Sequence, residues 1–198
     1  MVSRLVVGIS GASGAIYGVR CLELLRELGV ETHLVISKSG VLTIEQELGV
    51  SAASVRKLAD VVHAPGNIGA ACASGSFQTL GMIVAPCSMR SLAEIATGVT
   101  SSLLTRSAEV VLKERRRLVL LTRETPLTNT HIKNMLAVSE MGGIVMPPVP
   151  AFYTHPKSIE EMVDHTVSRA LDLFGLDTGK AKRWSGLDAA ERPVSTLI

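Results

Sequence analysis

The sequence predicts a single-domain α/β protein built on a doubly wound parallel sheet with helices on both faces. Short strand-like runs alternate with longer helical patterns along the chain, which is typical of parallel α/β folds. The strand-like runs are continuously apolar, as expected for strands that are covered on both faces. We expect this Rossmann-like domain to cover residues 1–175, and residues 176–198 to form a tail that either frays or packs on a neighbouring subunit.

The amino-terminal part of the chain supplies the first strands and helices of this pattern. Apolar residues recur at three-residue steps from Ile16 to Leu28, and Gly29 then supplies a helix stop. Ser51 is a suitable cap for the third helical segment. The expected elements are, in order, strand 5–7, helix 15–28, strand 32–36, helices 40–48 and 52–58, and one short strand within the irregular stretch 61–76.

The carboxy-terminal part repeats the alternation of strands and helices. Pro86 and Pro147 mark the ends of two apolar runs, and Ser158 is a suitable cap for the last long helix. The expected elements are strand 81–85, helices 88–96 and 101–113, strand 117–122, helix 129–141, strand 143–146 and a helix that ends at Leu173.

The composition excludes several classes of protein. With 46% hydrophobic and 19% charged residues, the 198-residue chain is too apolar to be disordered. A net charge of +2 gives no electrostatic reason to expect a nucleic-acid or membrane partner, and no apolar run is long enough to span a bilayer. Three widely spaced cysteines (Cys21, Cys72, Cys87) predict free thiols in a reducing cytoplasm rather than disulfides or a zinc site. The glycine-broken amino terminus is not typical of a signal peptide, so we expect a cytoplasmic protein.

The chemistry is expected at the carboxyl edge of the sheet, where open α/β sheets bind their ligands. The first strand–helix turn, residues 8–14, has small residues whose backbone N–H groups can approach an anion. Its spacing is GxxGxxG rather than GxGxxG, and Ser37 and Lys38 stand where an acidic ribose-binding residue would be needed. Both features argue against NAD. A close-packed turn without a ligand remains the alternative for residues 8–14.

A second strand–helix junction, at residues 86–91, could also bind an anion at the start of a helix. Ser88 either only caps the following helix or leaves the remaining N–H groups free for a phosphate. Two such junctions at one sheet edge favour a phosphorylated cofactor. Arg123 and Glu124 follow another strand, where they form either a surface pair or a proton-transfer site.

Other charged pairs have a plainer interpretation. Arg106, Glu109 and Lys113 share one helix face, which taken alone predicts a solvated surface. Glu161 and His165 are four residues apart on a helix, and no third ligand accompanies them. We therefore expect a helix-surface pair there rather than a metal site.

An ordered set of short motifs gives the chain a specific resemblance. They are residues 11–18 (GASGAIYG), 36–38 (ISK), 85–88 (APCS), 96–98 (ATG), 112–116 (LKERR), 123–126 (RETP), 146–148 (MPP) with 151–153 (AFY), and 182–184 (KRW). In this order they resemble the UbiX-type flavin prenyltransferases, within the wider flavin-dependent Cys-decarboxylase-like flavoproteins. The resemblance covers residues 4 to 184, and no motif of it falls within residues 61–76.

The resemblance implies a reaction and its partners. The family joins a dimethylallyl group from dimethylallyl monophosphate to N5 and C6 of reduced FMN, without a metal. The product, prenylated FMN, serves a UbiD-type decarboxylase. In the family, sites form between subunits of a homododecamer. The resemblance therefore implies that the tail of one subunit serves the flavin site of a neighbouring subunit.

The resemblance also implies roles for individual residues. FMN would be held by Gly11, Ala12, Ser13, Ser37, Ser88, Met89, Arg90, Ser91 and Arg123. The prenyl phosphate would be held by Arg106, Lys113, Tyr153 and Arg169. Ser13 and Glu124 would manage protons around N5 and C6, with Glu47 as a supporting carboxylate. Trp184 would offer a π face to the allylic cation.

Two other functions fit the sequence less well. A flavoprotein decarboxylase of the Cys-peptide kind would need a catalytic histidine on the first helix, where residues 16–19 (IYGV) offer none. A non-catalytic FMN-binding subunit would not need the set of Ser13, Glu47, Lys113 and Glu124. The flavin prenyltransferase is therefore the favoured hypothesis.

Overall fold

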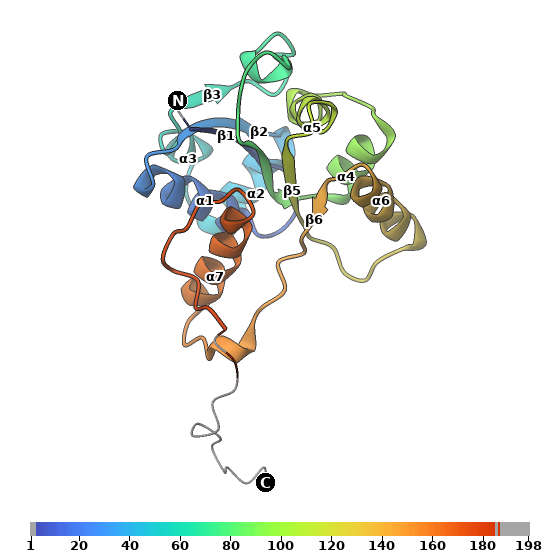
Figure 1. The fold of residues 1–198 in the computed structure, drawn as a ribbon. Helices are drawn as coiled ribbons and strands as arrows, with labels where there is room; N and C mark the ends of the chain where they lie inside the picture. Colours follow the sequence, from blue (N-terminus) through green and yellow to red (C-terminus); the bar gives the residue numbers. More distant parts are fainter. Residues whose placement is uncertain (1–2, 185, 187–198) are drawn as a thin grey trace, which may run out of the picture.

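The computed structural model, which describes residues 3–184 and 186, contains one six-stranded parallel sheet with strand order β3-β2-β1-β4-β5-β6 (Figure 1). The strands are β1 (Arg4–Ile9), β2 (Glu31–Ile36), β3 (Val61–His63), β4 (Gly81–Cys87), β5 (Arg117–Thr122) and β6 (Ile144–Val145). The chain winds outward from β1 to β3, returns to the centre and winds outward again from β4 to β6. This confirms the expected doubly wound α/β fold.

Helices cover both faces of this sheet. They are α1 (Ala15–Glu27), α2 (Lys38–Leu48), α3 (Ala52–Arg56), α4 (Met89–Thr97), α5 (Leu103–Lys113), α6 (Asn129–Glu140) and α7 (Ile159–Asp172), with 3₁₀ turns η1 (Ala71–Ala73) and η2 (Phe152–Thr154). Figure 1 shows α1, α2, α3 and α7 on one side of the sheet and α4, α5 and α6 on the other.

Alternation along each strand divides the core between the two faces. In β1, Leu5, Val7 and Ile9 pack with α1 and α7, whereas Val6 packs with α4 and α5 on the opposite face. Successive side chains of a strand point to opposite faces, so a strand that is apolar at every position can build two cores. The continuously apolar runs in the sequence have this structural origin.

Serine caps explain one difference between the expected and observed elements. Helix α2 begins at Lys38, two residues before the expected start, because the Ser37 hydroxyl accepts a hydrogen bond from Gly40 N. The caps expected at Ser51, Ser88 and Ser158 are confirmed, since each hydroxyl accepts from the backbone N–H three residues on. Such caps satisfy N–H groups that the helix itself leaves free.

Strand β4 runs past the expected stop at Pro86. Its register against β5 shifts between Val84 and Cys87, and the Ala85–Pro86 peptide bond is cis. Ser10 supports the shifted segment, because its backbone N–H and its hydroxyl both donate to Pro86 O, at 3.2 and 2.8 Å. Proline donates no hydrogen bond to a sheet ladder, so the strand continues through these contacts from the end of β1.

The described part of the tail packs on its own chain. Thr178 donates to Ser168 at 2.6 Å, and the Lys182 ammonium donates to Thr154 O at 2.9 Å. Arg183 pairs with Asp172 at the end of α7. The tail expected at residues 176–198 is thus held by α7 and η2 up to Trp184, while residues 185 and 187–198 lie outside the described residues.

Two expectations from composition can be compared with the structure. All three cysteines are buried free thiols, as expected. Among residues 3–184 and 186, no helix combines the length and apolarity that crossing a membrane requires.

The topology marks one place as a natural binding site. Strands β1 and β4 are neighbours in the sheet, but the chain leaves them in opposite directions. In doubly wound sheets, ligands bind outside the carboxyl ends of the strands at such a switch point. Ser10 lies there, at the end of β1, and its hydroxyl accepts from Ser88 N at 2.7 Å.

Candidate functional site

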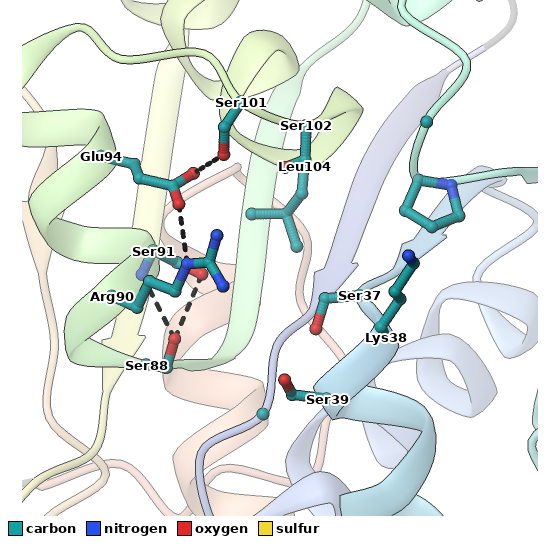
Figure 2. A pocket seen from close by; sticks show the side chains of 13 residues that line it. Ser37, Lys38, Ser39, Ser88, Arg90, Ser91, Glu94, Ser101, Ser102 and Leu104 are labelled. Atoms are coloured by element: carbon teal, nitrogen blue, oxygen red, sulfur yellow. Dashed lines mark hydrogen bonds and ion pairs between the residues drawn. The ribbon is translucent and has the colours of Figure 1, made fainter.

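A cavity of about 490 Å³ lies beside this switch point, at the carboxyl edge of the sheet. Its volume falls within the roughly 300–1,000 Å³ that is usual for small-molecule sites. The lining residues come from the turns after β1, β2, β3 and β4 and from the segment before α5: Gly11, Ser37, Lys38, Ser39, Pro65, Gly66, Ser88, Arg90, Ser91, Glu94, Ser101, Ser102 and Leu104. Figure 2 shows these residues arranged around the open space and labels ten of them.

Three helices begin at this cavity, each with a serine cap. Ser37 caps α2, Ser88 caps α4 and Ser102 caps α5, and all three serines line the cavity. A helix leaves four N–H groups without an intrahelical partner at its start, and a cap satisfies only one or two of them. The positive ends of three helix dipoles therefore meet at one place, which favours an anionic ligand.

Charged side chains add to this field. Lys38 and Arg90 line the cavity, and so does the carboxylate of Glu94. Burial by itself would raise the pKa of Glu94, but hydrogen bonds from Ser101, Arg90 and Thr105 hold that pKa below its ordinary value. Glu94 is therefore ionised at neutral pH, and the cavity carries two cationic side chains and one anionic one.

The start of α1 is organised differently, because the protein supplies its own anion there. The Glu47 carboxylate accepts hydrogen bonds from Gly14 N and Ala15 N, both at 2.9 Å. Burial would raise the pKa of Glu47, but the Ser13 hydroxyl, these two N–H groups and the charge of Arg123 lower it. At the end of the turn 8–14, the N–H groups of Gly14 and Ala15 thus meet an anionic group of the protein itself, the Glu47 carboxylate.

Gly11 is required by the close approach of this turn to α2. A Cβ atom at Gly11 would lie 2.3 Å from Ser39 Cβ, which no real contact allows. The glycine thus lets the turn after β1 pack directly on the first turn of α2, beside the cavity. This close packing was the alternative explanation for the glycine pattern, and the structure shows it at Gly11.

The predicted flavin-binding residues fall into two neighbouring groups. Gly11, Ser37, Ser88, Arg90 and Ser91 line the cavity. Ser13 and Arg123 instead interact with Glu47 at the start of α1. Ala12 lies in the turn between these two groups, and Met89 begins α4 and packs against the core on the α4–α5 face.

Glu124 and Cys87 lie at the same edge of the sheet. The Glu124 side chain is exposed and accepts from Thr125 N at 3.0 Å. Complete burial raises the pKa of Cys87 to about 12, so its thiol stays protonated at neutral pH. Of these two groups, only Glu124 is available for proton transfer.

A third group of predicted residues gathers around α7. The rings of Tyr153 and Trp184 meet edge to face with centroids 5.6 Å apart, and the Tyr153 hydroxyl lies 3.5 Å from His165 Nε2. Arg169 pairs with Asp172 at 2.6 Å on the same helix. His165 thus contacts Tyr153, and not the Glu161 side chain, which accepts from Lys157 N at 2.9 Å.

Lys113 and Arg106 stand apart from these groups. Lys113 ends α5, four residues before β5 begins, and its ammonium pairs with Glu114. It therefore lies at the amino edge of the sheet, whereas the cavity lies at the carboxyl edge. Arg106 pairs with Glu109 at 2.5 Å on α5. Lys113 is therefore remote from the cavity within one chain. Arg106 lies in the first turn of α5, where its backbone N–H donates to Ser102 O at 2.9 Å beside the cavity, but its side chain is not among the lining residues.

Sequence reasoning missed several lining residues. Ser101 and Ser102 were expected only as the start of a helix, although the spacing Ser102-x-x-Thr105 is a capping pattern. The spacing of Arg90 and Glu94, four residues apart on one helix, is a local signal of their ion pair, but the bond from Ser101 to Glu94 forms only in the folded chain. Pro65 and Gly66, from the stretch 61–76 that no motif covers, also line the cavity. Pro65 O accepts a hydrogen bond from Leu103 N at 2.8 Å in the cavity wall.

Comparison with known proteins adds independent information on this arrangement. The model of the family described as Flavoprotein matches residues 2–171. The chain is 57% identical over 187 residues to the flavin prenyltransferase UbiX of Neisseria meningitidis serogroup B, a match that covers 94% of this chain and 99% of that protein.

Two solved structures share the whole architecture. One is AnUbiX (PadA1) in complex with FMN and dimethylallyl pyrophosphate, with a TM-score of 0.93, 50% identity and coverage of 95% of this chain and 100% of that one. The other is a dodecameric FMN-dependent Ubix-like decarboxylase from Escherichia coli O157:H7, with a TM-score of 0.90, 52% identity and coverage of 92% and 100%.

Proposed function

The chain belongs to the Flavoprotein family, and within it to the UbiX-type flavin prenyltransferases, and from this premise we propose that it joins a dimethylallyl group to N5 and C6 of reduced FMN. The product would be prenylated FMN, a cofactor for a UbiD-type decarboxylase. We propose dimethylallyl monophosphate as the donor, no requirement for a metal, and a cytoplasmic location for the reaction.

The convergence of three serine-capped helix starts on one cavity is the observation that carries this proposal. The phosphate ester of FMN needs several hydrogen-bond donors and a positive field, and helix N-termini supply both. Lys38 and Arg90 add two cations. The donor set of the cavity therefore fits the phosphate end of FMN.

The start of α1 would receive the flavin ring, because Glu47 already occupies the anion position there. Reduced FMN, when bound, supplies the nucleophilic atoms N5 and C6. Ser13 and Glu124 would hold and transfer protons at these two atoms, and Glu47, whose pKa the neighbouring Ser13 hydroxyl helps to lower, would orient that hydroxyl. Arg123 would contact the flavin from the same side.

The prenyl phosphate would be bound by residues from more than one subunit. Tyr153, Arg169 and Trp184 gather around α7, and Lys113 lies at the opposite edge of the sheet from the flavin cavity. A single chain does not bring these groups together at the start of α1. We therefore propose a homododecamer in which neighbouring subunits complete each site, with Arg106 as a further phosphate ligand.

Cationic side chains would replace the metal in this reaction. Departure of phosphate leaves negative charge that Lys113, Arg169 and Arg106 can stabilise. The π face of Trp184 would attract the positive charge that develops on the allyl group, an interaction of about 0.5–2 kcal/mol.

Mass spectrometry of the flavin tests the proposed function. The purified protein is incubated without oxygen with reduced FMN, dimethylallyl monophosphate and EDTA. The flavin, extracted without oxygen, is expected to be heavier than reduced FMN by one C5H8 unit. Recovery of unmodified FMN from a protein that binds both compounds would reject the proposal, and a C5H8 adduct that forms only when magnesium replaces EDTA would reject metal independence.

A further inference from the structure

The Glu94 carboxylate forms hydrogen bonds with two segments of the cavity wall. Arg90 Nε donates to one oxygen of Glu94 at 2.9 Å, and the Ser101 hydroxyl donates to the other at 2.7 Å. Glu94 therefore connects the first turn of α4 to the segment that precedes α5. The same segment is held on its other side by the bond from Leu103 N to Pro65 O.

The two partners of this ion pair differ sharply in exposure. The Arg90 side chain is 81% exposed, whereas that of Glu94 is only 16% exposed. An exposed arginine without a fixed partner samples many rotamers. Glu94 is fixed by Ser101 on one side and by α4 on the other, so it can restrict the guanidinium to one orientation.

The atom that Glu94 engages decides where the rest of the guanidinium points. Because Nε faces the carboxylate, both Nη groups are left without this partner. In the view of Figure 2 both Nη groups lie on the side of Nε that faces the open space between α4 and the turn that carries Ser37 and Ser39. Two N–H-bearing nitrogens in this arrangement suit the paired oxygens of a phosphate.

We propose that Glu94 is a positioning residue for cofactor binding, which aims the Arg90 guanidinium across the cavity at the phosphate ester of FMN. This inference rests on the proposed function and assigns Glu94 a part in selecting a phosphorylated flavin over riboflavin. Glu94 does not contact the cofactor in this role; it acts through Arg90.

Because Glu94 is negatively charged, its removal affects FMN binding in opposite directions under the two roles it could have. A carboxylate beside an anion site weakens phosphate binding if it acts through its charge alone. Removal of Glu94 would then strengthen FMN binding. Removal of a residue that positions Arg90 weakens it instead, so the sign of the effect separates the two roles.

Flavin titration of the flavin-free protein measures this sign. Fluorescence quenching gives the dissociation constants of FMN and riboflavin for the wild type, Glu94→Ala, Arg90→Ala and the double variant. Each single variant is expected to lower the preference for FMN about tenfold, as befits a charge-assisted hydrogen bond. The double variant should lose no more than Arg90→Ala alone, and riboflavin binding should stay within about twofold of wild type.

Controls keep this test decisive. Glu45→Ala removes an exposed negative charge from α2 without touching the cavity and should leave the preference unchanged. Glu94→Gln replaces Glu94→Ala if thermal unfolding shows that the alanine variant does not fold. A general loss of structure would weaken riboflavin and FMN binding alike, and this result would overturn the inference.

Three further outcomes would also overturn it. A preference for FMN that is unchanged or higher in Glu94→Ala would show that Glu94 does not position Arg90. Independent, additive losses in the double variant would show the same. A wild-type protein that binds riboflavin as well as FMN would contradict the proposed cofactor site itself, and with it this inference.

Discussion

Glu47 has the clearest role at the scale of single residues. Its carboxylate accepts from two backbone N–H groups at the start of α1 and interacts with the Ser13 hydroxyl and Arg123. These contacts hold its pKa below the ordinary value, so the group is ionised at neutral pH. An ionised carboxylate can fix the orientation of Ser13. Because it also accepts from the N–H groups at the start of α1, those groups are not available to a phosphate.

Replacement of Glu47 by glutamine should therefore slow turnover while FMN stays bound. We expect a loss of about tenfold or more in the rate of prenylation, because proton transfer by positioned groups contributes about 10²–10⁴-fold to enzyme rates. Stopped-time mass spectrometry of the flavin gives the rate, and absorbance of the gel-filtered protein gives FMN retention. Glu45→Gln, on the exposed side of the same helix, is the matched control.

A Glu47→Gln variant with the wild-type rate would show that this carboxylate supports neither Ser13 nor the reaction. A variant that loses FMN would place Glu47 among the cofactor ligands instead.

The role of Glu47 was only partly predictable from the sequence. The resemblance named Glu47, but the local pattern gave no sign that it closes the turn at residues 8–14, because the contact joins two residues that are 32 positions apart, one at the start of α1 and one near the end of α2.

At the scale of elements, the close packing of α1 on the sheet explains the position of the turn at residues 8–14. A Cβ atom at Gly18 would lie 2.3 Å from Ala85 O and 2.8 Å from an Ile9 side-chain carbon. Glycine at this helical position lets α1 approach the carboxyl ends of β1 and β4. The start of α1, with Ser13 and Glu47, is thereby held against the switch point.

The Gly18→Ala variant should be destabilised despite the better helix propensity of alanine. The propensity gain is about 1 kcal/mol, whereas overpacking of a core contact costs about 1–3 kcal/mol, and the backbone oxygen of Ala85 cannot rotate away. Because the contact with this fixed oxygen places the overpacking cost near the upper end of its range, we expect a net loss of about 2 kcal/mol in the free energy of unfolding, measured by urea denaturation. Gly66→Ala, where a new Cβ atom meets nothing within 4 Å, should change stability by less than about 0.5 kcal/mol.

A Gly18→Ala variant as stable as the wild type would mean that α1 can shift on the sheet.

The helices and strands themselves were largely predictable, because continuous apolar runs and serine caps are local signals. The path of β4 through Pro86 was not, since it depends on the contacts that Ser10 makes from the end of β1. The short β6 (Ile144–Val145) was also overestimated, because Met146 and Gly143 lie outside the paired residues.

At the scale of the whole molecule, the placement of Lys113 argues for an assembly. Lys113 ends α5 at the amino edge of the sheet, and the cavity opens at the carboxyl edge. A phosphate-binding role for Lys113 therefore requires a second copy of the chain. Motif order in the sequence could name Lys113, but it could not reveal which subunit's flavin the residue serves.

Mixed oligomers test this arrangement. Coexpression of Lys113→Ala chains with Glu47→Gln chains should restore up to about a quarter of the wild-type activity, because random mixing of symmetric subunits completes that share of the sites. Chains with Ser13→Ala and Glu47→Gln are the matched control. These two residues interact within one chain, so their mixture should stay as inactive as each variant alone.

Activity in the first mixture no higher than in either parent would show that each chain uses its own Lys113. Activity in the control mixture would show that Ser13 and Glu47 also act across subunits. Either result would replace the proposed division of the site between neighbouring chains.

A crystal structure of the protein with FMN is the most direct measurement of the central claim, that the three serine-capped helix starts bind the cofactor's phosphate. We predict the phosphate within hydrogen-bond distance of the starts of α2, α4 and α5, near Ser37, Ser88 and Ser102, with the flavin ring toward Ser13 and Arg123. Glu47 should keep its hydrogen bonds to Gly14 N and Ala15 N. A phosphate bound at the start of α1, with Glu47 displaced from it, would contradict the account.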